Sequence, residues 1–184
     1  MTKDVLNRLS FRAYFENATL YDEDGNEYTK SFYLYDIAIY KDRDCGISRK
    51  DLENQLEEQG FSKKEIECIE DYEFDCYDGS WESQWFWFVP SVIEQCTGLK
   101  DKNGRPIFEG DIIKKPYNDF YEYSIHVISW EDGAYTTKRC LAMKNKKSGE
   151  LKDCSNGGFC FSSHVTQDLA NSFEVIGNVH KNAE

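Results

Sequence analysis

The stretch that decides the fold of the C-terminal half is Gln95-Cys96-Thr97-Gly98-Leu99-Lys100-Asp101-Lys102-Asn103-Gly104-Arg105-Pro106-Ile107-Phe108-Glu109-Gly110-Asp111-Ile112-Ile113. Asn103-Gly104 is a hairpin signal, because both residue types tolerate positive φ. Gly110-Asp111 marks a second turn, and the acidic side chains nearby are types that bond to turn backbone. We therefore expect short antiparallel strands. Turn architecture and a ligand site both stay open as the role of the polar residues.

Short apolar segments and turns continue toward the C-terminus. Asp132-Gly133 is a predicted turn between one strand at 123–130 and another at 134–143, and a final strand is predicted over 173–180. Polar residues and glycines at 145–158 predict a flexible loop. One or two helical turns are predicted over 163–170. Short strands at this spacing are typical of a small β-barrel.

The N-terminal half is predicted to contain four strands. Residues 10–15 and 28–40 are rich in aromatic and β-branched residues, and Asp24-Gly25-Asn26 supplies a turn between them. A third strand is predicted over 72–77. The run 83–89 has large apolar side chains at both odd and even positions, which is typical of a strand covered on both faces.

Two helices are predicted between these strands. Ser48-x-x-Asp51 resembles a capping box, in which each side chain bonds to the backbone N–H of the other residue, and Ser62-x-x-Glu65 is predicted to start the second helix. Gly60 is placed to end the first helix. The apolar residues that face inward are Leu52, Leu56, Ile66 and Ile69. The whole chain is therefore predicted to be α+β and mainly β.

Negative charge is concentrated in the N-terminal half. Residues 1–95 hold 22 of the 34 acidic residues but 10 of the 22 basic ones, whereas residues 96–184 hold 12 of each. Residues 51–82 carry 12 acidic residues and two lysines. An acidic surface repels phosphate, so no direct nucleic-acid binding is expected. The expected acidic docking face consists of Glu53, Glu57, Glu58, Glu67 and Glu70.

Membrane insertion and disorder are not expected. The longest apolar run, 85–90, is far shorter than the roughly 20 residues that span a bilayer. The first residues lead into no signal-peptide core, which predicts a protein that stays in the cytoplasm. An aromatic content of 15% argues against disorder, because chains that fail to fold are poor in aromatics.

No enzyme, cofactor or metal site is expected. The seven cysteines include no C-x-x-C pair, and no H-x-x-x-H accompanies them, so buried thiols are the favoured interpretation. His126 stands alone on a predicted strand, and His164 follows two serines too closely in sequence to pair with them as a base. Asp71 and Glu73 lie on one side of a predicted strand, but such a pair is expected by chance among 34 acidic residues.

Three motifs resemble the YopX family of bacteriophage and prophage proteins. Residues 95–113 resemble its signature Q-Y-T-G-L-K-D-K-N-G-K-E-I-Y-E-G-D-I-V, residues 11–13 resemble its opening F-R-A-W, and residues 173–180 resemble its closing E-V-I-G-N-I-Y. The resemblance implies a C-terminal SH3-like barrel, a phage or prophage source, a bacterial host cytoplasm and a homo-oligomer. It implies no enzymatic activity.

The chain departs from the family pattern in three places. Tyr14 replaces the usual tryptophan, Cys96 replaces a tyrosine, and residues 41–82 resemble an insertion with its own helices. We expect two domains, an N-terminal α+β region over 1–95 with this acidic helical insertion and a YopX-like barrel over 96–184.

Three binding hypotheses follow from these features. The first is a non-catalytic interaction module whose acidic face docks a basic host or phage protein. The second is an acidic DNA mimic that inhibits a host nuclease or restriction enzyme, since residues 52–73 have a faint similarity to antirestriction proteins of the ArdA kind. The third is a barrel that holds a small ligand against Phe108, Trp130 and Tyr135.

Overall fold

The computed structural model describes residues 10–22, 24–39, 45–73, 75–76, 85–131, 133–154 and 164–181. The chain is mainly β, as predicted, and it divides after Glu94 into two compact units. We call residues Ser10–Glu94 the N-terminal unit and the residues from Gln95 onward the C-terminal unit. Each unit is described by itself.

The N-terminal unit begins with a long hairpin. Strand β1 (Phe11–Tyr21) pairs antiparallel with β2 (Glu27–Tyr35), and Gly25 takes φ +83° in the turn between them. The register shifts between Phe15 and Ala18, which marks a β-bulge on β1. The predicted strand over 28–40 is in fact two strands, because Asp36 takes φ +54° and ends β2 before β3 (Ala38–Ile39).

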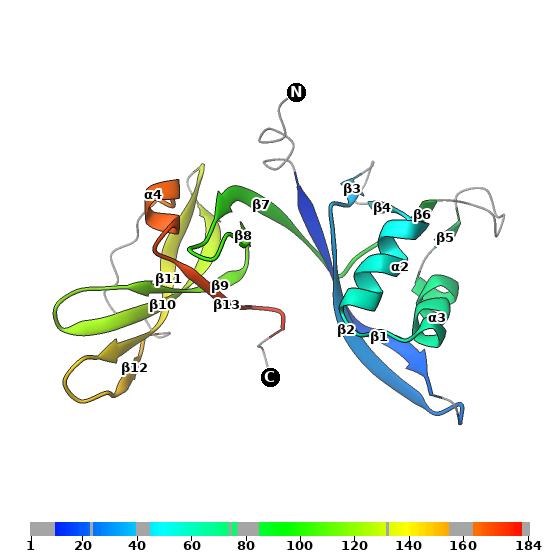
Figure 1. Ribbon diagram of the computed structural model, residues 1–184, viewed down its shortest axis with the longest axis horizontal. Helices are drawn as coiled ribbons and strands as arrows, with labels where there is room; N and C mark the ends of the chain where they lie inside the picture. The colour runs from blue at the N-terminus through cyan, green and yellow to red at the C-terminus, as the bar shows by residue number, and fades with distance from the viewer. Residues whose placement is uncertain are drawn as a thin grey trace. The chain divides into compact units, whose positions relative to one another are not determined.

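Helices α2 (Arg49–Glu58) and α3 (Lys63–Glu73) lie beside this hairpin, with α2 against β2 and α3 against β1 (Figure 1). Both predicted helix starts are confirmed. The Asp51 N–H donates to Ser48 Oγ at 3.2 Å, and the Ser62 N–H donates to Glu65 Oε2 at 2.7 Å. The residues predicted to face inward are all buried: Leu52, Leu56, Ile66 and Ile69.

A second sheet of the N-terminal unit has the order β3-β4-β6-β5, with β4 at Cys45–Ser48, β5 at Asp75–Cys76 and β6 at Trp85–Phe88. The predicted strand over 72–77 is wrong at its start. Helix α3 continues to Glu73, since no glycine or proline interrupts it, and Tyr77 lies outside the described residues.

The core of the N-terminal unit is aromatic. The rings of Phe15 and Phe32 are stacked with centroids 4.6 Å apart, and Phe88 lies 5.1 Å from Phe15. Phe86 and Phe88 of β6 are buried as predicted, but Val89, directly after the strand, is 69% exposed. The prediction that 83–89 is covered on both faces is therefore wrong at Val89, because β6 ends one residue earlier.

Strand β7 (Val92–Lys100) begins in the N-terminal unit and continues into the C-terminal one. It belongs to a four-stranded sheet with the order β2-β1-β7-β8. Strand β8 (Pro106–Phe108) follows the predicted Asn103-Gly104 turn. The other strands of the C-terminal unit form a curled sheet in the order β12-β11-β10-β9-β13 (Figure 1). They are β9 (Asp111–Pro116), β10 (Tyr121–Glu131), β11 (Ala134–Asn145), β12 (Leu151–Asp153) and β13 (Glu174–Asn178).

The predicted loop over 145–158 is only partly a loop. The N–H groups of Lys147 and Ser148 donate to Asn145 Oδ1 at 2.8 and 3.1 Å, and this tight turn leads into β12. Residues 155–158 lie outside the described ranges. The predicted helical turn is α4 (Gln167–Ala170), with Thr166 as its N-cap. In the part of the chain that the structure describes, no helix is long and apolar enough to cross a membrane.

A candidate acidic docking site

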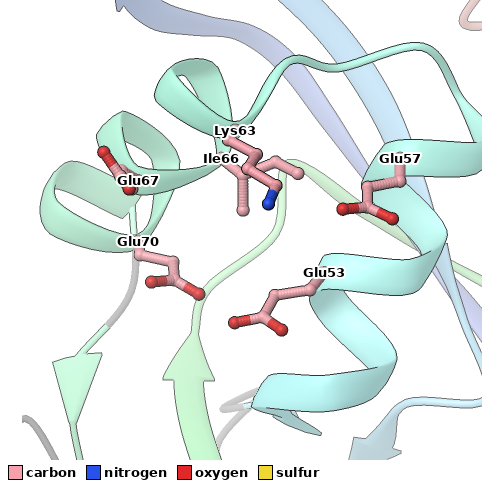
Figure 2. Close-up of a pocket in the computed structure, with 6 residues that line it drawn as sticks. All are labelled: Glu53, Glu57, Lys63, Ile66, Glu67 and Glu70. Carbon is pink, nitrogen blue, oxygen red and sulfur yellow. The ribbon is translucent and has the colours of Figure 1, made fainter.

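A cavity of about 240 Å³ lies between α2 and α3 (Figure 2). We call it the acidic pocket. Its lining consists of Glu53 and Glu57 from α2 and Lys63, Ile66, Glu67 and Glu70 from α3. Four carboxylates and one ammonium group therefore surround a single space.

The two helices present these groups at different depths. Glu57, Glu67 and Lys63 are exposed at the rim, whereas Glu53 and Glu70 are half-buried. Figure 2 shows the carboxylates of Glu53 and Glu57 directed toward α3, with the Lys63 side chain between the helices. Ile66, 5% exposed, supplies an apolar surface. The pocket can thus accept both a positive charge and the aliphatic stem that carries it.

Glu70 is held in place from outside the pocket. Its Oε2 lies 3.7 Å from Nη1 of Arg49, and the Arg49 guanidinium carbon lies 4.8 Å from the centre of the Phe86 ring. The side chains of Glu70 and Arg49 are 12% and 33% exposed, respectively. Glu70 is therefore part of the structure of the unit as well as of the pocket lining.

The predicted docking face and the pocket overlap closely. Four of the predicted glutamates line the pocket, and Glu58 is exposed but does not line it. Sequence reasoning did not include Lys63 in the site, although it starts α3 and was visible as one of two lysines in the acidic segment. The helix periodicity indicated which glutamates point outward, whereas the packing of α2 against α3 decides which of them meet.

The predicted ligand residues of the C-terminal unit come together only in part. Trp130 and Tyr135 are opposite each other on β10 and β11, with ring centroids 4.8 Å apart. Trp130 is 52% exposed, whereas Phe108 is 6% exposed and belongs to the core. Burial, with smaller effects of Glu109 and Cys96, raises the pKa of Tyr135 to about 12.

His126 is a packed histidine in the interior of the C-terminal unit. It is fully buried, its Nδ1 lies 2.7 Å from the carbonyl oxygen of Thr137, and its Nε2 lies 2.9 Å from Ser124 Oγ. Because a carbonyl only accepts, Nδ1 carries the proton and Nε2 accepts from the serine hydroxyl. Ser124 is also fully buried, so this pair cannot meet a substrate in the described structure.

The other groups considered for chemistry are dispersed. Asp71 and Glu73 belong to α3 and not to a strand, and His164 forms an isolated bridge with Thr136. The thiols of Cys45, Cys96, Cys140 and Cys154 are free and buried, and that of Cys68 is free and half-buried. Within the described ranges, no three His, Cys, Asp or Glu side chains are grouped so that they could hold a metal ion.

Comparison with known proteins decides the family. The family model described as "YopX protein" matches residues 11–184. The chain belongs to the YopX family. Its match includes residues 41–82, so the suggestion that this segment is an insertion stays a prediction. A search of curated proteins found no match.

Two solved structures are similar to this YopX family member over nearly the whole chain. Protein yopX from Bacillus subtilis is 13% identical, with 96% of this chain and 97% of that chain covered and a TM-score of 0.39. Protein EF1440 from Enterococcus faecalis is 21% identical, with 96% of both chains covered and a TM-score of 0.39.

The YopX signature contributes two buried carboxylates that bond to backbone. Asp101 Oδ1 accepts from the N–H groups of Asn103 at 2.8 Å and Arg105 at 2.9 Å, which closes the β7–β8 turn. Asp111 is fully buried and accepts from the Phe108 N–H at 2.8 Å. Gly104 and Gly110 take φ +80° and +78°. These contacts account for the signature as turn architecture, the first of the two roles left open.

The signature also binds the closing YopX motif. The Val175 N–H donates to Asp101 Oδ2 at 3.1 Å, the Lys102 N–H donates to the Phe173 carbonyl at 3.0 Å, and Asn178 Nδ2 donates to Asp111 Oδ1 at 3.4 Å. Two motifs that are far apart in the chain are therefore parts of one hydrogen-bonded structure.

Proposed function

We propose that this YopX family protein is a non-catalytic interaction module that docks a basic partner protein in the acidic pocket between α2 and α3. The observation that carries the proposal is the lining itself, in which four glutamates and one lysine surround a cavity of about 240 Å³. A cavity of this size can receive the end of a lysine or arginine side chain. The rim carboxylates would attract a positive surface before contact.

The chemistry of the pocket favours a side chain of a protein over a small ion. Ile66 offers an apolar wall for the methylene groups of lysine or arginine, and a guanidinium can bond two carboxylates in its plane. Because Glu57 and Glu67 are exposed, their attraction is screened by salt. We therefore expect binding that weakens as ionic strength rises.

Further parts of the proposal concern the setting. The curled sheet of the C-terminal unit is proposed to be an SH3-type barrel, and the protein is proposed to act as a homo-oligomer in the cytoplasm of a bacterial host, without binding nucleic acid directly. Light scattering after size-exclusion chromatography tests the oligomer. A monomer at every micromolar concentration would contradict it.

The test of docking uses two variants of equal charge. Glu57→Lys changes a pocket residue, and Glu58→Lys changes its exposed neighbour that does not line the pocket. Each serves as bait in host lysate beside the unchanged protein. Basic proteins recovered by the unchanged protein and by Glu58→Lys, but lost with Glu57→Lys, would support the pocket. Equal loss with both variants would show only a general effect of charge.

Lys63 provides a second variant with the opposite expectation. Among the described residues it is the one cation that lines the pocket, so Lys63→Gln leaves four carboxylates without a neighbouring ammonium. Partner affinity should rise if a basic side chain enters. The DNA-mimic alternative would instead be supported if duplex DNA displaces the partner from this protein and if the same variants change the affinity of that partner.

A further inference from the structure

The outer edge of β2 is partly covered by side chains that act like a neighbouring strand. The Gln59 side chain accepts from the Tyr33 N–H at 3.0 Å and donates to the Tyr33 carbonyl at 2.6 Å. The Gln55 side chain makes the same two bonds with Tyr35, at 2.7 and 3.0 Å. Gln55 lies in the last turn of α2 and Gln59 directly after the helix, so two side chains four residues apart bond to two β2 residues that are two apart.

The uncovered part of the same edge has the same orientation. Tyr33 and Tyr35 direct their backbone groups away from β1, and alternate residues of a strand share that direction. Thr29 and Ser31 therefore also point their N–H and C=O groups outward. Residues 27–29 and Ser31 are exposed. The β-bulge of the hairpin adds its extra residue to β1 and not to β2, so the alternation along β2 is not interrupted. Among the described residues, the backbone of Thr29 has no outward partner.

We propose that Glu27–Ser31 of β2 is a docking edge that takes an extended, basic segment of a partner polypeptide as an added strand. Outward backbone groups of an edge strand are a template for such pairing, and main-chain bonds supply the affinity. The two glutamines set the limit of the added strand, because their side chains already occupy the positions next to Tyr33 and Tyr35.

Charge near the edge selects a basic segment. Asp22 and Asp24 lie in the turn before β2, Glu27 is the first residue of β2, and the acidic helix α2 lies at the other end. Lys30 is already paired with Glu65 at 3.2 Å, so it offsets little of this charge. A segment with alternating lysines would place its ammonium groups among these carboxylates.

A second copy of this chain fits the edge less well. Antiparallel pairing of two β2 strands about Thr29 would place Gly25 of each copy opposite Tyr33 of the other. The acidic turn of one copy would then lie beside the acidic helix α2 of the other. Like charges at both ends would oppose this pairing. The docking edge is also separate from the acidic pocket, so either can fail without the other.

The probe is a short synthetic peptide of alternating lysine and valine, added to the full chain. Amide hydrogen exchange should slow at Thr29 and Ser31, whereas Tyr28 and Lys30, which face β1, should change little. The same peptide methylated at every backbone nitrogen should not bind, because it lacks the donors of an added strand.

Thr29→Pro removes one outward N–H and suits an edge position, since proline is tolerated where the N–H faces solvent. Its peptide affinity should fall about tenfold, as expected for the loss of one main-chain bond. Thr29→Val keeps the N–H and should bind normally. The proposal is overturned if the peptide does not bind, if Thr29→Pro binds as well as Thr29→Val, or if protection appears elsewhere. Protection of Thr29 without peptide, growing with protein concentration, would also overturn it in favour of a second copy.

Discussion

Asp101 and Val175 are separated by 74 residues and are joined by a hydrogen bond of 3.1 Å from the Val175 N–H to Asp101 Oδ2. The Asp101 side chain also holds the backbone of Asn103 and Arg105, and it is 4% exposed. One carboxylate therefore closes a turn and attaches β13 to it. The signature and the closing motif of the family meet at this side chain.

Replacing Asp101 should destabilise the C-terminal unit. Burial raises the pKa of Asp101, but the backbone bonds from Val175, Arg105 and Asn103 outweigh this effect and hold the pKa below its usual value. The stabilisation is present above the pKa of the unfolded chain and is lost as the pH falls through the lower folded value. Asp101→Asn should cost about 2 kcal/mol at neutral pH. Urea unfolding measures this, and the exposed Asp119→Asn, the control, should change stability little.

His126 should make the protein less stable in mild acid. Burial, and then the charge of Lys115, lowers the pKa of His126 from 6.5 to about 4. Between these pH values the unfolded chain binds a proton that the folded chain does not, so stability falls as the pH is lowered. The total loss is on the order of 3 kcal/mol. Urea unfolding at a series of pH values should show this slope, and His126→Gln should flatten it. An unchanged slope would contradict the assignment.

Gln59→Glu should weaken the attachment of α2 to β2. The glutamate side chain has the same shape and can still accept from the Tyr33 N–H, but it cannot donate to the Tyr33 carbonyl. Leaving that carbonyl opposite a carboxylate should cost about 1–3 kcal/mol of unfolding free energy. Thermal or urea unfolding measures the loss. The adjacent exposed Glu58→Gln changes charge without touching β2, and a loss of the same size there would contradict the explanation.

Arg12 and Glu94 form a buried ion pair whose partners should be coupled strongly. Arg12 Nε lies 2.6 Å from Glu94 Oε2, and the two residues are 1% and 2% exposed. Arg12→Met or Glu94→Leu alone should cost about 3–5 kcal/mol, because each leaves a buried charge behind, while the double variant should cost less than the sum. The same cycle on the exposed pair Lys102 and Glu174 should give a coupling of about 1 kcal/mol or less. Similar coupling in both pairs would contradict this prediction.

Local features of the fold were predictable from sequence. The caps at Ser48 and Ser62, the turn at Asn103-Gly104 and the inward faces of both helices depend on residues within a few positions of one another. The same reasoning failed at Tyr72 and Glu73, whose aromatic and acidic types suit a strand or a helix. The helix prevails there because nothing in the sequence stops α3.

Features that depend on tertiary contacts were not predictable. Gln55 and Gln59 are ordinary polar residues of a helix and its C-cap until β2 lies beside them, and Arg12 has no visible partner in its own segment. The acidic pocket was predictable only in part. Helix periodicity indicated its glutamates, whereas their common cavity depends on how α2 packs against α3.

The position of β9 has a consequence for folding during synthesis. This strand lies between β10 and β13, and β13 comes some sixty residues later in the chain. While a ribosome is still adding the residues before β13, one side of β9 has no neighbour and Asp101 and Asp111 lack their bonds to Val175 and Asn178. The nascent C-terminal unit would therefore remain incomplete, and open to chaperones or premature association, until its last strand has left the ribosome.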